Sequence, residues 1–477
     1  MSISRIFLWL AYALLFYAGL TFVSAIAAIF LDEFAHAQSL SLYAGLLSIL
    51  GAIIYFTSRD IPALETTRDA MVFLVLFWLF IPVVSAVPYL LLGAVETWPL
   101  AYFESVSAVT TTGASTLVPE IVPRSLLFMR SLIQWSGGVM VATFAVIILA
   151  ALNLSGTGVH RSILFKLKKG ELFSKLKQIG TVIAVLYLAI AFICFVLLVI
   201  LGTPIFDAIC LALSAVSTGG LVPRSGLLAD YVSGVGGIVL AITCLLGAAN
   251  ISILGDIMRK RNLASLKDMI TNIEHRGIFI IMSVFILFGI FYAGYMHFHT
   301  LIVESAFMVS TTGFDFHVIG VDILPPALLI GLSLVGGSAL STAGGIKIIR
   351  MLLLFHHMRT DLERMSHPSR VMPVRFQGQI IEDKSFLSVW MYFFAYTLVL
   401  AAGIGALGAA GMDLDNALLA CSSALSNMGP LLTIVNPDIS YAEQSPLILS
   451  ILTIIMLLGR VEVLAAIAVL SPSLWQK

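Results

Sequence analysis

The sequence predicts an all-α polytopic membrane protein, and three observations carry that prediction. Of its 477 residues, 60% are hydrophobic and only 11% are charged, and the mean hydropathy is +1.04. A soluble globular domain contains roughly 25% charged residues. Long apolar stretches also recur along the whole chain, and one short glycine-containing segment recurs four times between them.

The composition also excludes several classes of protein. The 26 basic residues are balanced by 26 acidic ones. A nucleic-acid-binding surface needs an excess of positive charge, so no nucleic acid is expected as a partner. The four cysteines lie apart in apolar stretches, which indicates neither a disulfide framework nor a thiolate metal site. The lipid bilayer is the expected partner of the apolar surface.

Ten apolar stretches are candidates for membrane-crossing helices, since a bilayer requires about 20 residues. The first stretch follows Arg5 and precedes the small-residue sequence Ala35-His36-Ala37, as a secretory signal would. It is too long for such a signal, and we therefore expect an uncleaved first span. The ten stretches cover residues 6–31, 41–57, 70–93, 125–153, 179–202, 231–254, 277–296, 325–354, 386–411 and 445–471.

Charged residues are distributed unevenly between the two sides of the predicted bundle. Most basic residues lie in the segments after the fourth, sixth and eighth stretches, and the positive-inside rule assigns these segments to the cytoplasm. Both termini are then cytoplasmic. Acidic residues on the opposite side are either ordinary solvated loop residues or a group that concentrates cations at an outer mouth. These acids are Glu96, Glu104, Glu120, Asp207, Asp230, Glu304, Asp315, Asp322, Asp413, Asp415, Asp438 and Glu443.

Four segments of the chain align with one another without a gap. They are residues 107–113, 214–220, 307–313 and 423–429, and each ends in glycine. Each lies between two long apolar stretches and follows a shorter stretch of about three helical turns. Such a short stretch covers only about half of the hydrocarbon thickness, so it must be re-entrant. Non-helical backbone at this depth is tolerated when protein surrounds it or when it lines a water-filled path.

The predicted unit is therefore a span, a pore helix, a filter loop and a second span. Four pseudo-symmetric units of this kind surround a central pore, and two N-terminal helices precede them. Glycine permits backbone conformations in which successive carbonyl groups point at one ion, and hydroxyl groups add further oxygen atoms. The predicted boundaries are 1–67 for the N-terminal helix pair and 68–165, 166–272, 273–375 and 376–477 for the four repeats.

With these features the sequence resembles the superfamily of Trk, Ktr and HKT potassium transporters, and specifically the bacterial TrkH/TrkG type. Besides the four loops, the resemblance rests on the small-residue run 336–347, on residues 427–430 and on residues 459–462. It covers essentially the whole chain. The two N-terminal helices favour the TrkH/TrkG branch over the shorter Ktr branch.

The resemblance implies potassium uptake across the bacterial inner membrane, with potassium as the transported ion and no cofactor in this chain. Family members with serine at the first filter position tend to pass sodium, so Gly113 implies selectivity for potassium. In the second loop, either Gly219 or Gly220 is the main donor, and the gap-free register favours Gly220. The implied filter residues are Thr111, Thr112, Gly113, Thr218, Gly219, Gly220, Thr311, Thr312, Gly313, Asn427, Met428 and Gly429.

The resemblance also implies a gate below the filter. The small-residue run should break its helix and form an intramembrane loop, with a small-residue packing face as the alternative. Arg460 is expected either to face the pore and raise the barrier to cations, or to form a buried pair with a glutamate or with backbone carbonyls. Lys347 and Arg350 also fit simple positive-inside anchors. The implied gate residues are Gly336, Gly337, Ser341, Thr342, Ala343, Gly344, Gly345, Lys347 and Arg460.

The resemblance implies two protein partners as well. One is a second copy of the chain in a homodimer, and the other is a dimeric cytosolic TrkA-type regulatory protein that binds nucleotide and controls the gate.

Other function classes fit the sequence less well. No His-Glu-x-x-His or Gly-x-Ser-x-Gly motif occurs, and Ser341 and Lys347 lie too far apart for a catalytic dyad, so an enzyme is not predicted. A secondary transporter with inverted repeats is disfavoured because the four copies run in the same orientation. Channel-like flux and proton- or sodium-coupled potassium symport both remain open, with Glu462 as the candidate proton-binding carboxylate.

Overall fold

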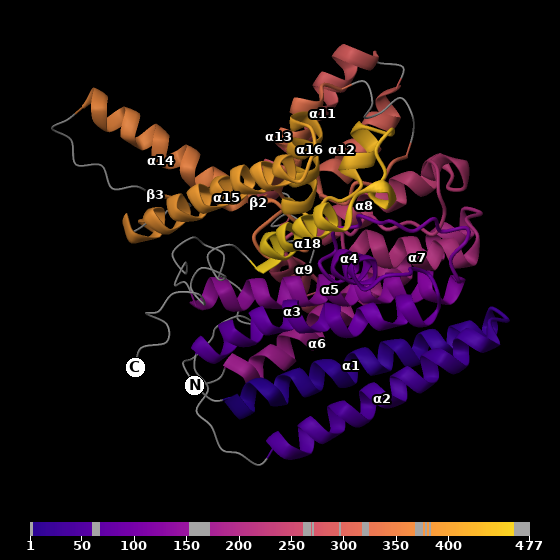
Figure 1. Ribbon diagram of the computed structural model, residues 1–477. Helices are drawn as coiled ribbons and strands as arrows, with labels where there is room; N and C mark the ends of the chain where they lie inside the picture. The colour runs from indigo at the N-terminus through magenta and orange to yellow at the C-terminus, as the bar shows by residue number, and fades with distance from the viewer. Residues whose placement is uncertain are drawn as a thin grey trace.

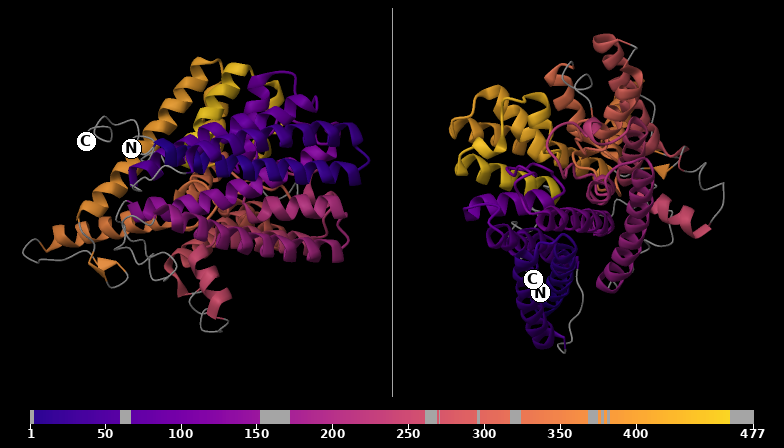
Figure 2. Two further views of the ribbon diagram at one scale, coloured as in Figure 1. Left: turned by 90° about the horizontal axis from the view of Figure 1, so that it is seen from below. Right: turned by 90° about the vertical axis from the view of Figure 1, so that its right-hand side faces the viewer.

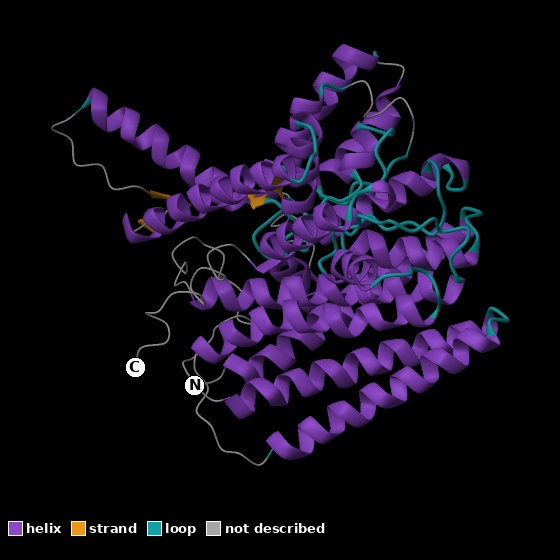
Figure 3. Cartoon of the chain, in the orientation of Figure 1, coloured by secondary structure: helices purple, strands orange, loops and turns teal. Residues whose placement is uncertain are grey.

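The computed structural model is almost entirely helical in the residues that it describes, which confirms the predicted fold class (Figure 3). Strands in those residues are limited to two sheets of two strands each. The described residues are 3–59, 67–151, 172–260, 269, 271–294, 297–316, 324–367, 375–376, 379–380 and 383–461.

The two N-terminal helices form a hairpin on the outside of the bundle (Figures 1 and 2). Helix α1 (Ile3–Phe30) packs along α2 (Phe34–Ser58) and also contacts α5 (Arg124–Ala151). The carboxylate of Glu33, in the turn of the hairpin, accepts hydrogen bonds of 2.8 and 3.1 Å from the first two N–H groups of α5. A carboxylate is favourable there because the first N–H groups of a helix have no partner within the helix. Glu33 therefore attaches the hairpin to the bundle.

A proline in α3 (Thr67–Leu91) explains a second attachment of the hairpin. Pro88 has no N–H, so the carbonyl of Val84, four residues earlier, lacks its helical donor. The hydroxyl of Tyr43 in α2 donates to this carbonyl at 2.6 Å. Tyr43 thus compensates for the proline and fastens α2 to α3.

Four short helices lie between pairs of longer helices, as the sequence repeat predicts. Each has 12 residues, about half the length that crosses a bilayer, and its C-terminal half is buried. The short helices are α4 (Trp98–Val109), α7 (Ile205–Val216), α12 (Phe298–Val309) and α16 (Leu414–Leu425). The remaining flanking helices are α6 (Leu172–Ile200), α8 (Gly234–Ala248), α11 (Ile273–Ala293), α15 (Asp383–Ala409) and α18 (Pro446–Val461).

The expectation of a single membrane-crossing helix is wrong for the stretch 231–254. In the described residues, six helices are long and apolar enough to cross a membrane, and the number is seven if a bent pair is counted as one span. The bent pair is α8 and α9 (Ile251–Lys260), which meet at an angle of 106°. The side-chain carbonyl of Asn250 accepts a 3.1 Å bond from the N–H of Ser252 and so caps the start of α9.

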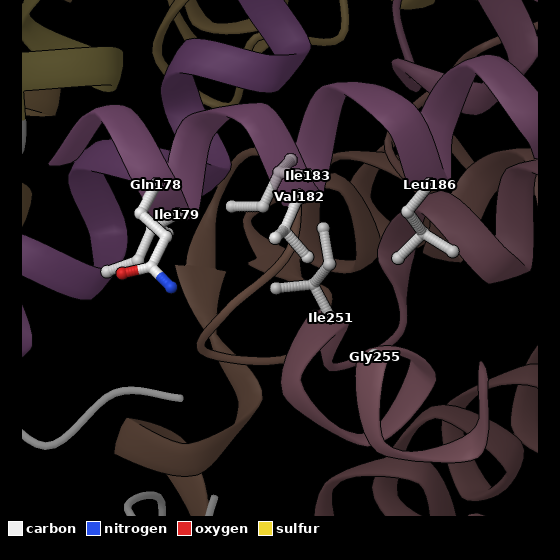
Figure 4. A pocket seen from close by; sticks show the side chains of 7 residues that line it. All are labelled: Gln178, Ile179, Val182, Ile183, Leu186, Ile251 and Gly255. Atoms are coloured by element: carbon white, nitrogen blue, oxygen red, sulfur yellow. The ribbon is translucent and has the colours of Figure 1, made fainter. Parts of the chain in front are cut away.

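The bend turns α9 against the side of α6 (Figure 4). Ile251 lies opposite Ile183 and Leu186 of α6, and the two helices enclose a cavity of only about 20 Å³. Helix α9 is therefore packed onto the bundle close to the point where α8 breaks.

The stretch 325–354 is broken in its middle, as its two Gly-Gly pairs predict. The parallel pairing of β1 with β2 brings the two ends of the break together. Helix α14 then leaves the body of the bundle, at the upper left of Figure 1. The elements of this region are α13 (Pro326–Ser333), β1 (Val335–Gly336), β2 (Ile346–Lys347), α14 (Ile348–Ser366), β3 (Arg375–Phe376) and β4 (Gln379–Ile380).

Candidate functional site

The four short helices end in the same backbone conformation. In each, the second residue after the helix is left-handed, with φ between 51° and 56°. Threonine is unusual there, because a β-branched residue is strained at positive φ. The four left-handed residues are Thr111, Thr218, Thr311 and Asn427.

The hydrogen bonds at the four helix ends are also the same. In the first loop, the N–H of Thr111 donates to the Ala108 carbonyl at 3.1 Å, and the N–H of Thr112 donates to the Ser107 carbonyl at 2.9 Å. The equivalent pair of bonds is present in the other three loops. This is the Schellman arrangement, which satisfies the last carbonyl groups of a helix. The four segments therefore correspond residue by residue.

The glycine that ends each segment distinguishes the fourth loop from the others. Gly113, Gly220 and Gly313 have φ values of 83°, 75° and 68°. In backbone conformation Gly220, rather than Gly219, corresponds to the glycines of the first and third loops. Gly429 does not have positive φ, and Pro430 follows it.

Close backbone contacts join the first three loops. A Cβ atom built on Gly113 would collide with the carbonyl oxygen of Gly219, and one built on Gly220 would collide with the carbonyl oxygen of Thr312. Any side chain at these two positions would therefore separate neighbouring loops.

The fourth loop closes the ring. Gly313 lies against Met428, since a Cβ atom there would be 3.2 Å from the methionine Cγ. The N–H of Gly429 donates to the carbonyl of Thr112 at 2.6 Å, which joins the fourth loop to the first. The structure thus brings all twelve sequence-predicted filter residues together in one ring, in which every threonine, Asn427 and Met428 is buried.

The ring opens onto a large cavity on its glycine side. This cavity has a volume of about 500 Å³, and its lining includes Gly113, Gly220, Gly313 and Pro430. On the other side, the guanidinium of Arg460 lies against the hydroxyl of Thr111. Arg460 also lines a cavity of about 30 Å³ that none of the twelve ring residues reaches.

A buried glutamate of α4 binds the chain segment that follows the first loop. Glu104 accepts hydrogen bonds from the N–H and the hydroxyl of Thr116 and from the hydroxyl of Ser115. The guanidinium of Arg130 lies 3.8 Å from the same carboxylate and donates at 2.9 Å to the carbonyl of Val222, just after the second loop. The Glu104–Arg130 pair therefore holds the chain segments that leave the first two loops.

Buried acids support the second and third loops as well. Glu304 of α12 accepts a 2.8 Å bond from the N–H of Phe316. Phe316 lies three residues after the loop glycine, at the position that Thr116 has in the first loop. Asp207 of α7 pairs with Arg224 at 2.6 Å. The expectation that Glu104, Asp207 and Glu304 are ordinary solvated loop acids is therefore wrong. Glu104 and Glu304 are buried because the non-helical backbone beyond their loops needs acceptors inside the protein. Asp207 is buried against Arg224.

The break between α13 and α14 lies against the break between α8 and α9. The N–H of Ser338 donates to the Ala248 carbonyl at 3.0 Å, and the N–H of Ile251 donates to the Leu340 carbonyl at 2.9 Å. Each broken helix therefore supplies partners for the backbone groups that the other leaves without helical bonds.

Two oppositely charged side chains fasten the loop between β1 and β2, which we call the break loop (residues 337–345). The carboxylate of Glu274 accepts a 2.8 Å bond from the N–H of Ala339. The ammonium of Lys347 donates to the carbonyl groups of Ser341 at 3.1 Å and Ala343 at 2.5 Å. It also lies 3.4 Å from the Ser341 hydroxyl, so the expectation that these two side chains are far apart is wrong. A carboxylate thus binds a donor of the break loop, and an ammonium binds its acceptors.

The expectation that Lys347 and Arg350 are simple positive-inside anchors is wrong. Lys347 is 8% exposed and Arg350 is 6% exposed. The guanidinium of Arg350 lies 3.8 Å from the ring centroid of Tyr392, in a cation–π contact. Both charges are therefore held inside the protein.

Arg460 lies between the ring of loops and the break loop. Its guanidinium donates to the carbonyl of Thr110, to the hydroxyl of Thr111 and, at 2.7 Å, to the carbonyl of Thr342. The expectation of buried bonds to backbone carbonyls is confirmed, and the barrier role of Arg460 stays a prediction. Glu462, the candidate proton-binding carboxylate, lies outside the described residues.

Three functional candidates were not identified from the sequence: Arg130, Asn250 and Glu274. Arg130 lies within the apolar stretch 125–153, where an ionisable side chain is expensive and usually has a specific partner. This signal indicates that a partner exists but not which one. Glu274 precedes the apolar stretch 277–296 and does not carry the signal.

Comparison with known protein families, sequences and structures agrees with this geometry. The profile of the TrkH family, described as a cation transport protein, matches residues 38–477. The Trk system potassium uptake protein TrkH of Salmonella typhimurium is 28% identical over 437 residues, 90% of each chain. The Trk system potassium uptake protein TrkG of Escherichia coli K12 is 29% identical over 443 residues, 90% of this chain and 89% of the relative. A crystal structure of the potassium transporter TrkH from Vibrio parahaemolyticus has a TM-score of 0.89 and 26% identity, with both chains fully covered.

Replacing Glu104 with alanine should destabilise the protein by about 3–5 kcal/mol, because the buried Arg130 would lose its carboxylate partner. Thermal unfolding of the purified protein in detergent measures the effect. Glu96→Ala is the matched control, since Glu96 is exposed. Equal unfolding midpoints for the two variants would contradict a supporting role for Glu104.

Proposed function

Since the chain belongs to the TrkH family of cation transport proteins, we propose that it takes up potassium across the bacterial inner membrane through the ring of four loops. The observation that carries this proposal is the closed ring of corresponding loops, with the same left-handed residue in each. Its relatives are named as potassium uptake proteins, which supports transport rather than catalysis as the function of this chain.

The chemistry of the ring suits a weakly hydrated monovalent cation. Backbone carbonyls replace the hydration shell of such an ion, and a ring of loops supplies them from four sides. Each loop also follows the C-terminal end of a short helix, where the partial negative charge of the helix dipole favours a cation. The proposed ligands are the backbone groups of residues 111–113, 218–220, 311–313 and 427–429. Each of the four predicted repeats contributes one quarter of this pathway.

The proposed gate is the break loop together with Arg460. Arg460 and the break loop are hydrogen-bonded directly to the ring, at Thr111 and Thr311, so the present arrangement fits a closed state. A guanidinium under the ring also repels cations at short range. The gate residues are those predicted from the sequence, Gly336, Gly337, Ser341, Thr342, Ala343, Gly344, Gly345, Lys347 and Arg460.

The proposed orientation follows the distribution of basic residues, with both termini and the break-loop side of the ring facing the cytoplasm. Potassium would then enter through the large cavity. Channel-like flux is the favoured mode, because the buried carboxylates Glu104, Glu274 and Glu304 each accept a backbone N–H bond. Proton- or sodium-coupled symport is the alternative.

We also propose that two copies of the chain form a homodimer and that a cytosolic TrkA-type protein, which binds nucleotide, moves the gate. One exposed apolar stripe on α14 supports the proposal that the second copy of the chain docks there. Its side chains are 50 to 80% exposed, although the ion pairs along the same helix are typical of a segment in water. The stripe consists of Phe355, Met358, Leu362 and Met365.

Cells that lack their own potassium systems should grow on low potassium and accumulate rubidium when they express this protein. Gly113→Ser should lower the preference for potassium over sodium at least severalfold, because a side chain at φ 83° would collide with the Gly219 carbonyl. Absence of uptake by the unaltered protein would contradict the proposed function. An unchanged ion preference in Gly113→Ser would contradict the filter assignment alone.

Arg460→Ala should raise rubidium flux by about tenfold, which corresponds to a barrier lower by about 1.4 kcal/mol. Arg359→Ala, an exposed arginine on α14, is the control. The barrier role of Arg460 is wrong if Arg460→Ala transports no faster than the control at equal protein levels.

Leu362→Glu should convert the dimer to a monomer, because a carboxylate cannot be buried at an apolar interface without a partner. Native mass spectrometry of the purified protein reports the oligomeric state. Arg364→Glu, which introduces the same charge on the opposite face of α14, should leave the dimer intact. A Leu362→Glu variant that stays dimeric would rule out this face as the dimer contact.

A further inference from the structure

The left-handed residue at the end of each short helix has a side chain that reaches out of its own loop. In the first three loops this residue is threonine, at a position where glycine or asparagine fits best. A β-branched residue is retained at positive φ only when its surroundings compensate for the strain. The contacts of the three hydroxyl groups therefore indicate what the threonines do.

All three hydroxyl groups connect the ring to the break loop. The N–H of Gly344 donates to the hydroxyl of Thr311 at 2.7 Å. The hydroxyl of Thr218 donates to the hydroxyl of Thr342 at 3.0 Å. The hydroxyl of Thr111 accepts from Arg460, whose guanidinium also donates to the carbonyl of Thr342. Three loops of the ring are thus bonded to the break loop, two directly and one through the arginine.

The residues immediately before these threonines provide an internal comparison. Their hydroxyl groups turn back to their own helices, as Ser217 does by donating to the Leu213 carbonyl at 2.8 Å. Thr110 and Ser310 do the same with the carbonyls of Val106 and Phe307. A carbonyl of the preceding helix is therefore available to a hydroxyl group at the end of each short helix. The outward bonds of the next residue are therefore specific to the break loop.

The fourth loop meets the break loop through its backbone. A Cβ atom built on Gly344 would collide with the carbonyl oxygen of Ser426. Asn427 instead donates to the carbonyl of Met456 in α18 at 3.0 Å and to the hydroxyl of Thr112 at 2.9 Å. The break loop is therefore in contact with, or linked to, all four loops of the ring.

We infer that the hydroxyl groups of Thr111, Thr218 and Thr311 are positioning groups that couple the ring of loops to the break loop. This inference rests on the proposed function and deepens it. The bonds exist only while the break loop is in its present place, so they favour the closed state. When the break loop moves, the three left-handed threonines lose the contacts that compensate for their strain. The backbone geometry of the ring loops then changes. Because coupling is reciprocal, ion selectivity should depend on the position of the gate.

Thr311→Val tests the inference, since valine keeps the shape of threonine and removes the hydroxyl. Loss of one neutral hydrogen bond should raise basal rubidium uptake in the absence of the cytosolic partner by about two- to tenfold. It should also lower the preference for potassium over sodium. Thr311→Ser, which keeps the hydroxyl, should restore both properties. Thr243→Val is the control, because the hydroxyl of Thr243 donates to the carbonyl of Val239 in its own helix and Thr243 belongs neither to the ring nor to the break loop.

A double-mutant cycle tests the second contact. Thr218→Val and Thr342→Val should each raise basal uptake, and the double variant should have no larger effect than the stronger single variant, because the two hydroxyls share one bond. Uptake and selectivity of Thr311→Val equal to those of the unaltered protein, or independent multiplicative effects of Thr218→Val and Thr342→Val, would overturn the inference.

Hydrogen–deuterium exchange of the full-length protein in nanodiscs provides a measurement that does not require transport. The peptide that contains Gly344 should exchange faster in Thr311→Val than in the unaltered protein, Thr311→Ser or Thr243→Val. Failure of the unaltered protein to take up rubidium contradicts the proposed function, whereas unchanged exchange at Gly344 contradicts the coupling. The two failures are therefore distinguishable.

Discussion

The structure depends on one constraint: backbone polar groups at membrane depth need partners inside the protein. Two broken helices meet this constraint together. The carbonyl of Gly247, at the end of α8, accepts bonds from both the N–H and the hydroxyl of Thr342. In return the N–H of Ile251, at the start of α9, donates to the Leu340 carbonyl. An unpaired amide in an apolar environment costs about 2–7 kcal/mol, so neither break is stable without the other.

The same constraint explains why small residues gather in this region. A Cβ atom on Gly336 would collide with the Gly344 carbonyl, and one on Gly345 would lie 2.9 Å from the Leu334 carbonyl. The break loop can cross the path under the ring only because backbone packs directly on backbone. Glycine has the same use in the ring, where Gly113 and Gly220 lie against carbonyl groups of the next loop. Glycine residues that let backbone pack directly on backbone are therefore common to the ring and the break loop.

Features that repeat along the chain could be predicted, and features that depend on one long-range partner could not. The four-fold alignment predicts the short helices and the place of Gly220, because the same local bonds recur in every copy. The turn at Asn250 was missed because the stretch 231–254 is apolar, with no proline to mark the break. Glu104 and Glu304 were misassigned to a solvated mouth because composition does not reveal that an acid faces a backbone N–H twelve residues later.

Arg460 links the two parts of the candidate pathway through the acceptors that it uses. Its donors bind oxygen atoms of the ring, at Thr110 and Thr111, and of the break loop, at Thr342. A cation that left the ring on this side would meet the same oxygen atoms. The guanidinium and the ion therefore compete for one set of ligands as well as repelling each other. Movement of the break loop removes the Thr342 carbonyl from this set, and the arginine must then turn away from the axis or share the remaining acceptors with the ion. Under the proposed function, a single buried charge would thus make the occupancy of the ring by an ion depend on where the break loop lies.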